Sequence, residues 1–226
     1  LRKFLAADPK SPRRAEAKLK LGIAQVRLKQ YDDARETFRA LVKDGGMESY
    51  EASVWLARVY LRQGQGDKLL DFARTLPASS LSAEQKGQIT LFAGMWLEDQ
   101  GRFDDAVVWY RQVAKVGEPM SQRAEAGWRV GWVYYRMARY REVVDELRLL
   151  ADQHDYDFEP QALYWMGRAA ELSQQPHARD LYVQLCQRYV YTYYCQMARE
   201  RINITLSEPL AVEPISSTAP LNGGAP

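Results

Sequence analysis

The chain is poor in the residues that most often build metal centres and nucleophilic active sites. It has two cysteines and two histidines among its 226 residues. His154 and His177 lie far apart and have no paired cysteine spacing beside them, so the sequence predicts no metal site. No pattern joins a nucleophile to a base and an orienting acid. We therefore predict no catalytic residues and no cofactor in this chain.

The chain also lacks an excess of charge of one sign and long apolar runs. The 31 basic and 29 acidic residues leave a formal net charge of +2, whereas a nucleic-acid-binding surface needs basic residues gathered on one face. No segment approaches the roughly 18 consecutive apolar residues of a membrane-spanning helix. Residues 1–5 lack the apolar stretch of a signal peptide. We expect neither a nucleic acid partner nor a membrane span.

What the sequence has is a repeat. Small residues recur at Gly22, Ala57, Gly94, Gly131 and Gly167, separated by 35, 37, 37 and 36 residues. Each lies in an apolar pattern typical of one helix, and a second helical pattern follows it. This period indicates a helix pair copied along an α-solenoid rather than one enclosed core. Solenoids usually act through an extended concave surface.

The repeat divides the chain into three parts. We expect residues 1–11 to be the end of a preceding repeat helix, which Asp8-Pro9 ends. Residues 12–204 are expected to form about five helix pairs and a capping helix near residues 191–202. Residues 205–226 alternate proline with serine, threonine, glycine and alanine, and cannot bury enough apolar surface to offset the entropy of ordering. We predict a disordered tail or linker there.

The recurring small residues predict close helix packing. Glycine costs about 1 kcal/mol relative to alanine inside a helix, so repeated glycines indicate packing that offsets this cost. We expect alanines such as Ala34 and Ala106 to face the small residues, and large residues such as Phe38 and Tyr110 to fill the space between repeats. The second pair has the weakest pattern.

The two cysteines leave two interpretations open. Cys186 and Cys195 lie on either side of a predicted turn. They are either two small buried hydrophobic residues or a disulfide between the last two helices, formed in an oxidising compartment.

Several motifs resemble the tetratricopeptide repeat. They are Leu21-Gly22 with Tyr31-Asp32-Asp33-Ala34 and Phe38, and Gly101-Arg102-Phe103-Asp104-Asp105-Ala106 with Tyr110. The resemblance covers residues 12 to 190 and implies an all-α, right-handed, tetratricopeptide-like α-solenoid. It also implies a non-catalytic scaffold that binds a protein or peptide in a concave groove. The lysine and asparagine set that chaperone-binding repeats use to hold a C-terminal carboxylate is missing.

Two narrower resemblances concern location and function. The junction at residues 8–12, followed by Ala17 and Leu21-Gly22, is similar to repeats of bacterial cell-envelope proteins, which implies a periplasmic or envelope location. Residues 162–201 resemble the superhelical domain of soluble lytic transglycosylases, although Val190 replaces a proline usual in that family. That resemblance implies an alternative function, the helical part of a transglycosylase whose peptidoglycan-cleaving domain lies outside this chain. Peptidoglycan would then be a partner.

Repeat geometry also predicts the residues that face the groove. The aromatic-rich part lies on the first helices of the fourth and fifth pairs, and comprises Trp128, Trp132, Tyr135, Arg136, Tyr164, Arg168 and Glu171. Earlier pairs contribute Leu19, Ile23, Val54, Arg58, Leu61, Leu91, Met95 and Glu98. Aromatic faces with a few charges suit peptide anchors or stacked sugar rings. The other interpretation is that these aromatic residues fill gaps between successive repeats.

Overall fold

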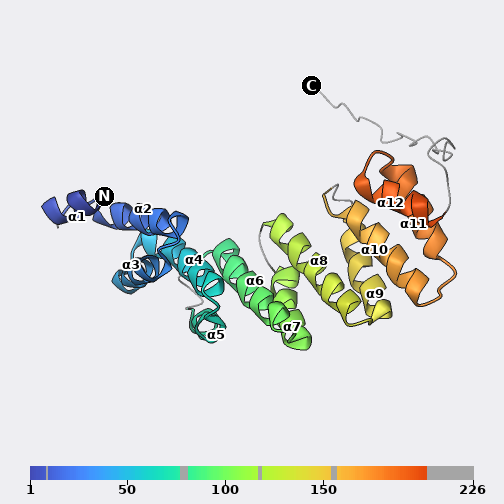
Figure 1. The fold of residues 1–226 in the computed structure, drawn as a ribbon, viewed down its shortest axis with the longest axis horizontal. Helices are drawn as coiled ribbons and strands as arrows, with labels where there is room; N and C mark the ends of the chain where they lie inside the picture. Colours follow the sequence, from blue (N-terminus) through green and yellow to red (C-terminus); the bar gives the residue numbers. More distant parts are fainter. Residues whose placement is uncertain (9, 77–80, 117–118, 154–156, 203–226) are drawn as a thin grey trace, which may run out of the picture. The chain divides into compact units, whose positions relative to one another are not determined.

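All regular secondary structure in the described part of the chain is helical. The computed structural model describes residues 1–8, 10–76, 81–116, 119–153 and 157–202, and the predicted tail at 205–226 lies outside them. The helices are α1 (Arg2–Ala7), α2 (Arg14–Arg27), α3 (Tyr31–Asp44), α4 (Met47–Arg62), α5 (Gly66–Thr75), α6 (Ala83–Asp99), α7 (Phe103–Val116), α8 (Met120–Arg136), α9 (Tyr140–Ala151), α10 (Glu159–Leu172), α11 (Ala178–Arg188) and α12 (Tyr193–Arg201) (Figure 1). The predicted all-α fold class is confirmed.

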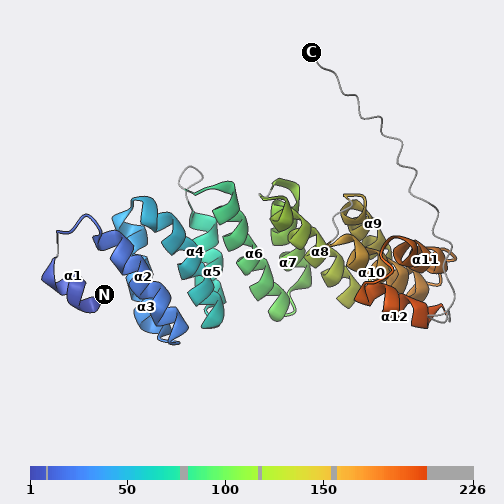
Figure 2. The same ribbon diagram turned by 90° about the horizontal axis from the view of Figure 1, so that it is seen from above.

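The helices form two compact units, one from Leu1 to Glu146 and one that begins at Leu147. In the first unit α2, α4, α6 and α8 follow one another in a row, each in contact with the next (Figure 2). The second helices of the pairs, α3, α5 and α7, lie along one side of that row (Figure 1). In the second unit α10, α11 and α12 all contact one another. The boundary falls within α9, between the recurring glycines Gly131 of α8 and Gly167 of α10.

The same turn joins the two helices of each pair. Five residues, each seven positions after the small residue of its pair, have positive φ between 56° and 71°: Lys29, Gly64, Gly101, Ala138 and Gln174. The next residue donates its backbone N–H to a carbonyl at the end of the first helix, as Gln65 does to Tyr60 at 2.9 Å. This is the Schellman arrangement, which ends a helix on one left-handed residue. The turn is thus a constant part of the repeat although glycine occupies it only twice.

Ala138 is the turn residue whose replacement should stabilise the protein. At φ 56° its Cβ costs about 1 kcal/mol, which glycine avoids. We expect Ala138→Gly to raise the free energy of unfolding by about 0.5 kcal/mol, because the greater freedom of glycine in the unfolded chain offsets part of the gain. Urea unfolding measures it. Ala40→Gly, at an exposed position inside α3, is the control and should lower stability by about 1 kcal/mol; an equal loss at Ala138 would contradict the strain.

The glycines of the ladder accommodate aromatic rings. A Cβ added to Gly22 would lie 2.5 Å from the ring of Phe38, and one added to Gly94 would lie 2.4 Å from the ring of Tyr110. Both rings are completely buried. We predicted such rings only between repeats, yet each covers the glycine of its own pair. Phe38 also reaches the next pair, where it stacks on Trp55 with 6.2 Å between centroids.

The weak pattern of the second pair corresponds to a short second helix. α5 has 10 residues, compared with 14 in α3. Gly66 is the first residue of α5, and Trp96 of α6 packs against it so closely that a Cβ added to Gly66 would lie 1.7 Å from the indole. The indole of a neighbouring helix therefore covers the start of α5, where a side chain would leave no room for it.

Candidate functional site

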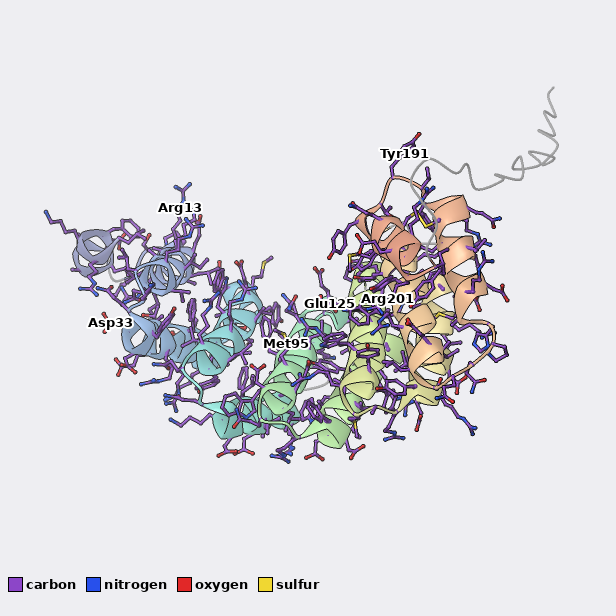
Figure 3. All side chains as sticks on the ribbon, turned by 45° about the vertical axis from the view of Figure 1, so that its right-hand side comes forward. Arg13, Asp33, Met95, Glu125, Tyr191 and Arg201 are labelled. Atoms are coloured by element: carbon purple, nitrogen blue, oxygen red, sulfur yellow. A yellow bond between two sulfur atoms is a disulfide. The ribbon has the colours of Figure 1, made fainter. Side chains whose placement is uncertain are left out.

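The first unit presents one surface that its second helices do not cover. We name the side of α2, α4, α6 and α8 that faces away from α3, α5 and α7 the first-helix face. Figure 3 shows Met95 of α6 and Glu125 of α8 on this side. Ile23, Arg58 and Trp132 occupy the same repeat position as Met95, one residue after the small residue of the pair, and Val54 and Trp128 lie four residues before Arg58 and Trp132 on the same helix face. All six side chains are half-buried. Apolar, aromatic and charged side chains are therefore all within reach of a ligand there.

Three of the predicted groove residues form an aromatic ladder along α8. The rings of Trp128 and Trp132 stack with centroids 6.1 Å apart, and those of Trp132 and Tyr135 stack at 5.7 Å. Tyr140 meets Tyr135 edge-on at 5.8 Å. The spacing of four and three residues places the ladder on one helix face. All four rings are half-buried, so they pack on one another and also keep part of their surface open.

Arg136 is engaged in the packing of the helices. Its Nη1 donates to Oε1 of Glu98 at 2.9 Å, and its guanidinium lies 4.7 Å from the centroid of Phe103. Glu98 is only 7% exposed and also accepts the Tyr110 hydroxyl at 2.8 Å. Arg129 lies 3.7 Å from the same carboxylate. Arg136 thus links α6 and α8, and its predicted role as a ligand contact stays a prediction.

The pKa of Tyr110 reflects this network. Burial raises it above its ordinary value, and the negative charge of Glu98 raises it further. The hydroxyl therefore stays protonated and remains a donor to Glu98.

The second unit contains a matching network around Glu171. Oε2 of Glu171 accepts the Tyr182 hydroxyl at 3.0 Å and Nη1 of Arg168 at 2.6 Å. Oε1 lies 3.4 Å from Nη1 of Arg201 on α12. In both units, a glutamate thus lies four residues after the recurring glycine of a first helix. It pairs with a tyrosine of the second helix and with an arginine of a helix that comes later in the chain. Arg168 and Glu171, which we predicted to face a ligand, hold α10, α11 and α12 together.

Tyr164 lies in the core of the second unit and not on an open groove. It is 5% exposed, and its ring contacts those of Tyr182 and Tyr194 with centroids 5.9 Å and 5.7 Å away. This burial favours the interpretation that the ring fills space between helices, and its role as a ligand contact stays a prediction. The predicted groove residues therefore lie in two different local environments, with four on α8 in the first unit and three on α10 in the second.

The Glu171 network predicts a loss of stability in acid. Burial acts to raise the pKa of Glu171, but hydrogen bonds from Arg168 and Tyr182 and the arginine charges outweigh it, so the pKa lies below its ordinary value. A carboxyl whose folded pKa is lowered stabilises the fold above its unfolded pKa of about 4.3, and this contribution disappears as pH falls through the folded pKa.

We therefore expect the stability difference between the parent and Glu171→Gln to shrink as pH falls below about 4. Urea unfolding followed by circular dichroism across this range measures it. Glu200→Gln, at an exposed site on α12, controls for the loss of a negative charge. A difference that stays constant down to the acid limit would contradict the network.

A cavity of about 290 Å³ lies between α4 and α6 on the first-helix face. It is lined by Glu51, Val54, Trp55 and Arg58 of α4, and by Ser82, Glu84, Gln85 and Gln88 at the start of α6. We predicted Val54 and Arg58 as groove residues and missed the rest. Trp55 precedes Arg58 by three residues, so helical spacing carried a signal for it. The α6 residues carried none, because their place depends on how α6 packs beside α4.

Local structure fixes the walls of this cavity. On α4, Nε1 of Trp55 donates to Oε1 of Glu51 at 3.2 Å, and Phe38 stacks behind the indole. On α6, the Ser82 side chain accepts the backbone N–H of Gln85 at 3.2 Å, and the Gln85 side chain accepts the backbone N–H of Ser82 at 3.0 Å. This capping box fixes the first turn of α6. Both walls are thus held before any ligand arrives.

The described residues contain no group of three or more histidine, cysteine, aspartate or glutamate side chains that would hold a metal ion. None of the described helices is both long and apolar enough to cross a membrane.

Comparison with known proteins identifies the repeat. Residues 1–46 and 19–80 match the family model described as tetratricopeptide repeat. These tetratricopeptide repeat (TPR) matches lie within the first 80 of the 226 residues. No curated protein sequence matches the chain significantly.

Solved structures extend the TPR fold to most of the chain. The TPR-like repeats of a putative kinesin light chain from Podosopora anserina are similar, with a TM-score of 0.58, 15% identity and coverage of 87% of this chain and 100% of that one. YrrB, described as a TPR protein with an unusual peptide-binding site, has a TM-score of 0.57 and 11% identity over 87% of this chain and 97% of its own. At these identities the likeness shows the fold alone.

Proposed function

We propose that this chain is a non-catalytic TPR scaffold that binds an extended peptide segment of a partner protein on the first-helix face of the first unit. The observation that carries the proposal is the cavity between α4 and α6, whose walls combine an indole, a guanidinium, amides and carboxylates. Such a mixture suits a peptide, which presents apolar, polar and charged groups together. YrrB, with its peptide-binding site, offers a precedent within the same fold.

The fold supports this proposal because a row of parallel first helices makes an extended surface. Val54 at the cavity and Met95 on the next helix are half-buried apolar side chains on that surface. Single apolar groups spaced along a polar surface can hold alternate side chains of an extended segment.

Selection from a random peptide library displayed on phage tests the proposal. We expect peptides that bind the parent protein and bind Met95→Glu at least about tenfold more weakly, since a charge is placed on the first-helix face. Val108→Glu is the matched control, because Val108 of α7 is 60% exposed and lies on a second helix. Circular dichroism verifies that both variants are folded. Peptides weakened equally by both variants, or only by Val108→Glu, would overturn the proposal.

We further propose an oxidising compartment, in keeping with the resemblance to bacterial envelope proteins. Cys186 and Cys195 are joined by a disulfide with Cα atoms 4.8 Å apart, which is the second of the two interpretations that the sequence left open. Both cysteines are buried. Disulfides persist in secreted, periplasmic and surface proteins and are rare in the cytosol.

The likeness of residues 162–201 to lytic transglycosylases, and peptidoglycan as a partner, stay predictions. Neither of the similar structures described above is a transglycosylase. The peptide-binding proposal does not depend on them.

Loss of the disulfide should destabilise the second unit. The bridge closes a short loop between α11 and α12, with a sequence separation of 9, so we expect the double variant Cys186→Ala/Cys195→Ala to lose about 2 kcal/mol of unfolding free energy. Urea unfolding with and without reductant measures it. Reductant should destabilise the parent and leave the double variant unchanged. Equal stability of parent and variant under both conditions would show that the thiols are not bonded.

A further inference from the structure

We propose that Arg58 recognises the carboxylate of an acidic side chain in the bound segment, while a basic side chain of the same segment lies against Glu51 and Glu84. The inference rests on the proposed function and specifies the chemistry of its ligand.

Arg58 is a half-buried cation held between aromatic rings. Its guanidinium carbon lies 4.6 Å from the centroid of Trp55 and 5.5 Å from that of Phe92. No carboxylate of the described residues forms an ion pair with it, whereas Arg129 and Arg136 on the same face each have one. Burial lowers the pKa of Arg58, and the nearby charge of Arg62 lowers it further. An anion arriving at Arg58 would therefore relieve a cost that the free protein bears.

The aromatic contacts orient Arg58 for this task. Phe38 stacks on Trp55, and the Arg58 guanidinium lies close to both Trp55 and Phe92, so these contacts connect α3, α4 and α6. A guanidinium stacked on rings keeps its N–H donors at its edges, in the fork that matches a carboxylate. Because the two ring contacts limit the rotamers of Arg58, less entropy is lost on binding.

The rest of the cavity has the opposite charge. Glu51 lies two turns before Arg58 on α4, and Glu84 lies in the first turn of α6. Among the cavity-lining residues these are the two acidic groups, and Arg58 is the one cation. A ligand with only acidic groups would be repelled at one end and a purely basic ligand at the other. An internal segment that carries both signs satisfies the whole lining, which a C-terminal carboxylate alone does not.

Helix geometry sets the spacing of the two charges. The seven residues from Glu51 to Arg58 correspond to about 10 Å along α4. An extended peptide rises about 3.3 Å per residue, so the basic and acidic residues of the ligand should be about three positions apart. Gln85 and Gln88 also line the cavity and offer amide groups to the peptide backbone.

The phage-selected peptides test this inference. We expect them to be enriched in a lysine or arginine about three residues from an aspartate or glutamate. A synthetic peptide with one Lys and one Glu at this spacing is then compared with its Glu→Gln analogue. Arg58→Gln should weaken binding of the Lys/Glu peptide about tenfold and leave the Gln analogue nearly unchanged, because removing either charge removes the same contact.

Arg27→Gln is the matched control, since Arg27 is an exposed arginine in the last turn of another first helix, α2, and does not line the cavity. It should leave both affinities unchanged. If the selected peptides are sensitive to Met95→Glu but show no charge pair, or if Arg58→Gln weakens both synthetic peptides equally, the inference fails while the proposed function stands. If no selected peptide is sensitive to Met95→Glu, the proposed function itself fails.

Discussion

Glu98→Ala should lower the free energy of unfolding by about 3 kcal/mol, the largest single effect that we expect. Glu98 is buried and accepts from the Tyr110 hydroxyl and from Arg136 on opposite oxygens. Its removal leaves a buried hydroxyl without a partner and deprives Arg136 of its carboxylate. Both arginines beside it, Arg129 and Arg136, are partly exposed to water, which keeps the loss at the lower end of the range for broken buried ion pairs.

The control is Glu125→Ala on the same surface. Glu125 pairs with Arg129 one turn away on α8 and is 43% exposed at its side chain, so its removal should cost about 0.5 kcal/mol or less. Urea unfolding monitored by circular dichroism compares the two. Equal losses would mean that Glu98 contributes only as a surface charge and that α6, α7 and α8 are held by apolar packing alone.

Gly94→Ala is expected to have the second largest effect, a loss of about 2.5 kcal/mol in the free energy of unfolding. The new Cβ would lie 2.4 Å from the ring of Tyr110. That ring is completely buried, and its hydroxyl is bonded to Glu98. The ring cannot move aside without breaking this hydrogen bond, so the substitution combines overpacking with damage to the network.

Gly127→Ala, also on a first helix, is expected to raise the free energy of unfolding. Nothing lies within 4 Å of a Cβ added there, so alanine should stabilise α8 by about 1 kcal/mol through its higher helix propensity. The two glycine variants should thus shift the urea midpoint in opposite directions. A stabilising Gly94→Ala would contradict the close contact between ring and glycine on which the repeat packing is built.

Much of the fold could be predicted because the repeat imposes the same local demands five times. The small residues that recur from Gly22 to Gly167 predicted the helix pairs and their order along the chain. The left-handed conformation of Lys29, Ala138 and Gln174 was not predicted, because these residue types rarely adopt positive φ and glycine is the residue type that indicates it in a sequence. Their geometry follows from the helix packing on both sides of each turn.

The candidate site was predicted less well, because pairing across helices decides which side chains remain open. Arg136 and Glu171 occupy groove positions of the repeat, yet each is held by a partner that lies 30 or more residues away in sequence. Arg58 occupies an equivalent position and has no such partner among the described residues. No local pattern separates these cases, since the difference depends on whether a neighbouring helix places a carboxylate opposite the arginine.

Photo-crosslinking from Gln88 tests the central claim most directly. Gln88 lines the cavity between α4 and α6, and a photoreactive residue there should form a covalent adduct with a phage-selected peptide. The same residue placed at Val108 on α7 should give none. Mass spectrometry of the digested adduct identifies the attachment site. Adducts at Gln88 and not at Val108 are the predicted result; efficient crosslinking from Val108 with none from Gln88 would show that the peptide binds the second helices, and would contradict the account.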